Sequence, residues 1–97
     1  MRGFVHILKD TSQQAPGTYS YAVIFAPIGP TGTGGAVPSR NLQGKDDLID
    51  FLGRRMHIDQ RSIQDALHDL ETNGNASIAF VDLLEDELRD LRLIQVG

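Results

Sequence analysis

Asp65 and His68 come nearest, by residue type and spacing, to a metal site. They lie three positions apart, so on a helix both side chains would project from one face. A metal site needs three or four ligands, usually drawn from more than one segment. The chain has no second pair of this kind and no cysteine that could supply a thiolate. We therefore expect a surface histidine beside a carboxylate, and no metal.

The remaining nucleophiles form no recognisable catalytic arrangement. Ser12, Ser39 and Ser62 lie outside the strained G-x-S-x-G turn that exposes a nucleophilic serine. Carboxylates are numerous, but they fall on predicted solvent-facing helix positions, where general acid–base catalysis is not expected. These residues predict that the protein is not an enzyme and that it needs no cofactor.

The segment 29–34 follows an apolar stretch and matches the first six positions of the phosphate-binding loop G-x-x-x-x-G-K-[ST]. The match ends there, because Gly35 replaces the lysine that contacts the phosphates and Ala36 replaces the hydroxyl that holds magnesium. Pro38 also interrupts the helix whose N-terminus should face the phosphates. Nucleotide hydrolysis is therefore not expected.

A small anionic ligand is one alternative hypothesis for the same region. Residues 27–44 are rich in glycine and proline, and this composition predicts a long loop rather than a helix. Backbone amides and one cation could contact an anion there. The candidate contacts are Gly32, Gly34, Ser39 and Arg40.

A winged-helix-like nucleic-acid-binding regulator is a second alternative. The order helix, turn, helix, glycine turn and strand over residues 48–78 is similar to the order in winged helix-turn-helix domains. The outward face of the second predicted helix, however, carries three acids against Arg61 alone, and a reading helix needs a neutral or positive face. We do not expect a nucleic-acid partner. If one binds, replacing Arg54, Arg55 or Arg61 should weaken the binding.

Two strands are predicted in the N-terminal half. Residues 4–8 and 19–26 read as adjacent antiparallel strands, joined by a polar connection that contains Pro16 and Gly17. In the second strand, one face is bulky and the other is mostly small. This alternation is typical of a sheet that packs helices on one face.

The C-terminal half predicts two helices followed by a strand over residues 77–81. The first helix has Asp46 and Asp47 in its first turn, which suits the helix dipole. The second begins after a cap at Asp59, and Asn73-Gly74 ends it. The predicted inward residues are Leu48, Ile49, Leu52 and Met56, with Phe51 at the edge, and then Ile63, Ala66, Leu67 and Leu70.

A third, short helix is predicted after the strand, with Asp82 and Glu85 as its capping pair. Leu93, Ile94 and Val96 could form a last strand or a docked tail.

Composition and charge set the class of protein. The chain of 97 residues is 40% hydrophobic and 23% charged, with a formal net charge of −4. These values are ordinary for one globular domain spanning residues 1–97, and no apolar run approaches a membrane span. We expect a cytoplasmic protein without membrane contact. The predicted helices carry most of the acids, which we interpret as solvated surface.

Together these signals predict an α+β fold in the order β-β-α-α-β-α. The fold would be a small antiparallel sheet of two to four strands with two or three helices packed on one face. Its predicted role is a small non-enzymatic interaction or accessory module that forms a homodimer or binds another protein. The second strand or its bulky face is the predicted interface, since short helices could leave part of it uncovered. The interface candidates are Tyr19, Tyr21, Val23 and Phe25.

Overall fold

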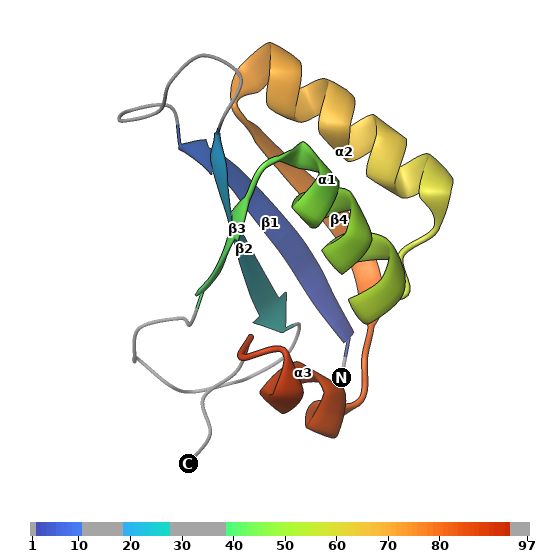
Figure 1. The fold of residues 1–97 in the computed structure, drawn as a ribbon. Coiled ribbons are helices and arrows are strands. Elements are labelled where there is room, and N and C mark those ends of the chain that lie inside the picture. Colours follow the sequence, from blue (N-terminus) through green and yellow to red (C-terminus); the bar gives the residue numbers. More distant parts are fainter. Residues whose placement is uncertain (1, 11–18, 28–38, 94–97) are drawn as a thin grey trace.

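The computed structural model describes residues 2–10, 19–27 and 39–93, which form an α+β fold (Figure 1). The four strands of the described sheet are all antiparallel and lie in the order β3-β2-β1-β4. The strands are β1 (Arg2–Asp10), β2 (Ser20–Pro27), β3 (Ser39–Gln43) and β4 (Asn75–Asp82). The helices are α1 (Lys45–Asp50), the π-helical turn η1 (Phe51–Arg55), α2 (Gln60–Asn73) and α3 (Glu85–Asp90).

The predicted fold class is confirmed, and so is the antiparallel pairing of the first two strands. The element order differs at one place, because β3 adds a strand before the first helix. The sequence predicted a long loop over residues 27–44, and β3 lies within that range. β3 is polar apart from Leu42, so it carries little of the apolar alternation by which strands are recognised.

The helices cover one face of the sheet, which we call the inner face. Figure 1 shows α1 and α2 lying across this face, with α3 at the end where β1 begins. Every second residue of β1 and β2 points into the single core beneath them. The inward predictions for α2 hold, since Leu67 is 6% exposed and Leu70 is 2% exposed.

The first helix departs from its predicted face. Phe51, expected at the edge, is buried, whereas Ile49, expected inside, is only partly buried. Leu48, Phe51 and Leu52 are spaced i, i+3, i+4, so they share one face of an ordinary helix, and Ile49 lies beside that face. The π turn acts further along: the N–H of Met56 donates to the carbonyl of Phe51 at 3.1 Å, five residues back, and the extra residue places Met56 inside while Arg55 is exposed.

Both predicted ends of α2 are confirmed. The Asp59 carboxylate accepts hydrogen bonds from the backbone N–H of Ser62 at 3.1 Å and from its hydroxyl at 2.8 Å. At the other end Gly74 has φ of 81°, and its N–H donates to the carbonyl of Leu70. This left-handed conformation is one that glycine adopts without strain.

The predicted start of α3 needs a correction. Asp82 still belongs to β4, so the helix begins later, with Leu84 as its N-cap residue. Glu87 closes the first turn instead, because its Oε1 accepts a hydrogen bond from the backbone N–H of Leu84 at 3.2 Å. Of the predicted tail, Leu93 is fully buried, while Ile94 and Val96 lie outside the described residues.

Within the described ranges, none of the helices is long and apolar enough to cross a bilayer.

Candidate functional site

The sheet face opposite the helices, which we call the outer face, is a surface that no described helix covers (Figure 1). All the helix residues in the core cluster pack on the inner face. Side chains on a strand alternate between faces, so the strand register assigns the outer residues. Between the charged residues at its two ends they are Phe4, His6 and Leu8 of β1, Ser20, Ala22, Ile24 and Ala26 of β2, Ser39, Asn41 and Gln43 of β3, and Asn75, Ser77 and Ala79 of β4.

The outer face is apolar along its middle and polar along both sides. The central strands β1 and β2 contribute two aliphatic side chains, Leu8 and Ile24, and the ring of Phe4. The flanking strands contribute mainly hydroxyl and amide groups, and β4 also contributes the small side chain of Ala79. Leu8 is 47% exposed, which is high for a leucine in a central strand. An apolar centre inside a polar rim is the composition of an interaction surface.

His6 lies at the middle of β1 and is held in a defined orientation. Its Nδ1 is 2.8 Å from the hydroxyl oxygen of Ser77 on β4, within hydrogen-bonding distance. Its ring also stacks against Phe4, with ring centroids 6.3 Å apart. On its other side the register places Ile24 of β2. The imidazole is therefore an ordered polar group within an apolar stripe.

Formal charges on the outer face are confined to its two ends. Arg2 and Asp82 lie opposite each other in the strand register at one end, and Asp10 lies at the other. Among the described residues between them, His6 is the one outer-face side chain of an ionisable type. The acids of the C-terminal half are concentrated on the helices instead.

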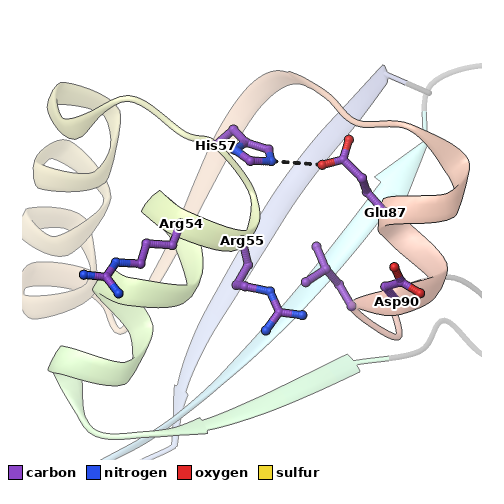
Figure 2. Close-up of a pocket in the computed structure, with 6 residues that line it drawn as sticks. Arg54, Arg55, His57, Glu87 and Asp90 are labelled. Carbon is purple, nitrogen blue, oxygen red and sulfur yellow. Dashed lines mark hydrogen bonds and ion pairs between the residues drawn. The ribbon is translucent and has the colours of Figure 1, made fainter.

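A second feature is a cleft of about 180 Å³ between η1 and α3 (Figure 2). Nε2 of His57 lies 2.9 Å from Oε2 of Glu87 across it. The other carboxylate oxygen of Glu87 caps α3, so both oxygens already have partners. Figure 2 shows Arg54 and Arg55 pointing in different directions, and Arg54 pairs with Asp50 at 3.1 Å. The cleft therefore joins two segments, and its cations do not converge on one point.

A second hollow, of about 280 Å³, lies between α1, η1 and α2. It is lined by isoleucines, by amide side chains and by the Asp50–Arg54 ion pair. It contains neither a histidine nor an unpaired acid, so it offers no acid–base or metal chemistry.

The predicted interface residues are corrected by their burial. Tyr21 is 7% exposed, and Val23 and Phe25 are fully buried, because the helices cover the whole bulky face of β2. Tyr19 is partly buried, and the Nζ of Lys9 lies 4.2 Å above the centre of its ring. β2 also has a paired strand on each side, so it offers no free edge.

The predicted ligand-loop residues do not come together in the described structure. Gly32 and Gly34 lie outside the described residues, as does the rest of segment 29–36. Ser39 is exposed at the start of β3. Arg40 points to the inner side, where its guanidinium lies 5.5 Å from the centre of the Phe51 ring and donates to the carbonyl of Leu91 at 3.5 Å. Its visible role is to connect β3 with the end of α3.

The residues that were considered for a metal site and for a recognition helix lie on the surface. Asp65 and His68 are both exposed on α2, and the described residues include no group of three possible metal ligands. On the same helix Glu71 pairs with Lys45 at 3.2 Å. The outward side of α2 therefore keeps the acidic character that argued against nucleic-acid binding.

Sequence reasoning missed His6 as a member of a surface. The available signal was its phase, since it alternates with the core residues Val5 and Ile7. Ser77, its partner, is 71 positions away, so no local pattern connects the two.

Comparison with known proteins gave no match to a family model, to a curated protein or to a solved structure.

Proposed function

We propose that this protein is a small non-enzymatic interaction module that associates with a second copy of itself through the outer face of its sheet. The observation that carries the proposal is the apolar, uncharged middle of that face, which no described helix covers. Packing two such faces together would remove Leu8, Ile24 and Phe4 from water in both copies.

The distribution of charge supports a second copy as the partner. The chain has a net charge of −4, and its acids lie mainly on the helical side. Two copies that met through their helices would repel each other, whereas contact through the outer faces keeps the acids apart. An acidic chain whose sheet face is uncharged in its middle also offers little attraction to a nucleic-acid backbone.

The size of the face predicts a weak dimer. β1 has nine residues and β2 has eight. At about 3.3 Å per residue and about 4.8 Å per strand, a four-stranded face covers roughly 500 Å². A standard interface buries about 800 Å² per partner, so we expect dissociation in the micromolar range or above rather than an obligate dimer.

The two exposed leucines provide a matched test. Among the described residues Leu8 and Leu84 are the two exposed large hydrophobic side chains, and only Leu8 lies on the outer face. The variants Leu8→Lys and Leu84→Lys each add one positive charge, so they change the repulsion between acidic chains equally. Sedimentation equilibrium near pH 8 should show dimers for the wild type and Leu84→Lys, and monomers for Leu8→Lys.

A wild-type monomer throughout the range up to about 1 mM would overturn the proposal, since this surface would then be too weak to bring two copies together. Equal dissociation constants for the two lysine variants would also overturn it, because the outer face would not be the site of contact.

A further inference from the structure

His6 occupies the centre of the outer face. It is the fifth of the nine residues of β1, and β1 is one of the two central strands. Its neighbours across the strands are Ile24 of β2 and Ser77 of β4. A side chain in the middle of an interface loses its contact with water on association, whereas one at the rim does not.

Two identical faces that pack together do so about a two-fold axis, and residues near that axis meet their own copies. In the proposed dimer the axis would pass near the middle of β1 and β2. The two His6 imidazoles would then lie close to each other, between sheets about 10 Å apart.

Among the residues that the structure describes, the surroundings of His6 include no acid that could neutralise a protonated ring. On β1 its outer-face neighbours are Phe4 and Leu8, and the charged Arg2 and Asp10 are four residues away, about 13 Å along the strand. The outer-face positions of β2 and β3 are uncharged, and on β4 the nearest acid, Asp82, lies opposite Arg2. Salt screens charges at such distances strongly, because the Debye length is about 8 Å at physiological ionic strength.

We infer that His6 makes self-association depend on pH, with the neutral imidazole permitting the dimer and the protonated imidazole dissociating it. The inference rests on the proposed function. At low pH the His6 imidazole of each copy is protonated before the copies associate. To form the dimer, each imidazole would have to release that proton or be buried as an unpaired cation beside the imidazolium of the other copy. Both alternatives oppose association. Forming the dimer should therefore release protons, and its affinity should fall as the pH falls through the range in which histidine titrates.

Sedimentation equilibrium of the full chain near pH 8 and near pH 5.5, at about 0.15 M salt, tests this inference. The wild-type dissociation constant should rise by at least about tenfold on acidification. His6→Asn keeps a polar group near the position of Nδ1, and His6→Phe is an uncharged side chain that favours strands. Each variant should form dimers at both pH values, and its dissociation constant should change little between pH 8 and pH 5.5.

The other two histidines of the chain supply the controls. His57→Asn and His68→Asn should keep the full pH dependence, because both residues lie on the helical side, away from the outer face. If acid weakened association by partially unfolding the protein, His6→Asn would lose affinity as much as the wild type does. This variant therefore distinguishes partial unfolding from an effect of His6 itself.

The outcomes distinguish the two proposals. A wild-type dimer that keeps its affinity near pH 5.5, or a His6→Asn variant that weakens as the wild type does, would overturn the pH dependence and leave the interface standing. Absence of a dimer near pH 8 would overturn both. If the wild type dimerises in a pH-dependent way, and only the two His6 variants lose that dependence, the result supports both the interface and its pH dependence.

Discussion

Nε2 of His57 lies 2.9 Å from Oε2 of Glu87, and this contact joins the turn before α2 to the first turn of α3. The same carboxylate accepts a hydrogen bond from the backbone N–H of Leu84 through its other oxygen, at 3.2 Å. His57 has φ of 59°, a left-handed conformation that is uncommon for residues other than glycine, although histidine adopts it more often than most. One glutamate therefore caps a helix and contacts a residue of unusual backbone conformation thirty positions away.

The two roles of Glu87 can be separated by substitution. Glu87→Gln keeps an oxygen that can accept from Leu84 but loses the charge opposite His57, whereas Glu87→Ala loses both. We expect Glu87→Ala to lower the free energy of unfolding by about 1–2 kcal/mol, and Glu87→Gln by less than about half of that. Urea denaturation followed by circular dichroism measures both values. Equal losses in the two variants would show that the helix cap contributes nothing.

Gly3 and Gly53 should respond to alanine with opposite signs. A Cβ on Gly3 would overlap the carbonyl oxygen of Ala26 and lie 2.7 Å from Cζ of Phe25. We expect Gly3→Ala to destabilise the fold by about 1–3 kcal/mol, because the backbone of β2 cannot move away cheaply.

A Cβ on Gly53 would lie 3.6 Å from Cδ1 of Ile63, an ordinary contact. Because Gly53 lies in a helical turn, Gly53→Ala should stabilise the protein by about 0.5–1 kcal/mol. Thermal or urea unfolding measures both alanine variants. A stabilised Gly3→Ala variant would contradict the close packing of β1 against β2.

The Asp59 cap should contribute to the stability of the protein in acid. The hydroxyl of Ser62, and then its backbone N–H, hold the pKa of the Asp59 carboxyl below its ordinary value of 3.8. Because the folded pKa is the lower one, the stabilisation is present above about pH 3.8 and is lost as the pH falls through the folded value.

Asp59→Asn can still cap the helix but does not titrate. The wild type should therefore lose stability relative to Asp59→Asn as the pH falls from about 5 to about 2, as measured by urea denaturation at each pH. Ser62→Ala should reduce that difference. Parallel stability curves for the wild type and Asp59→Asn would contradict the assigned pKa direction.

Arg40 should stabilise the fold, although its position after the glycine-rich segment suggested ligand binding. Replacing it with alanine removes the contact with the Phe51 ring and the hydrogen bond to the carbonyl of Leu91. We expect Arg40→Ala to lower the free energy of unfolding by about 1–2 kcal/mol.

Arg55→Ala is the control for Arg40→Ala. Arg55 is also an arginine but is exposed, and its replacement should change the free energy of unfolding by less than about 0.5 kcal/mol. If Arg40→Ala changed the free energy of unfolding as little as Arg55→Ala does, the contacts of the Arg40 side chain would not stabilise the packing of β3 against the end of α3.

Local patterns in the sequence were sufficient wherever the physical cause is itself local. The cap at Asp59, the left-handed Gly74 and the inward spacing of Ile63, Ala66, Leu67 and Leu70 each depend on residues within one or two turns. The alternation in β2 and its antiparallel pairing with β1 follow from a period of two and a turn-forming connection. The α+β class could therefore be predicted without coordinates.

Only the tertiary structure decided which face of the sheet is covered and which is open. Alternation divides the residues of β2 into two faces, but it does not say whether three short helices can cover Tyr21, Val23 and Phe25 completely. The pairing of polar β3 with β2 and the contacts of Arg40 and His6 likewise join separate segments of the chain. These features depend on how distant elements pack against one another, and no short stretch of sequence contains that information.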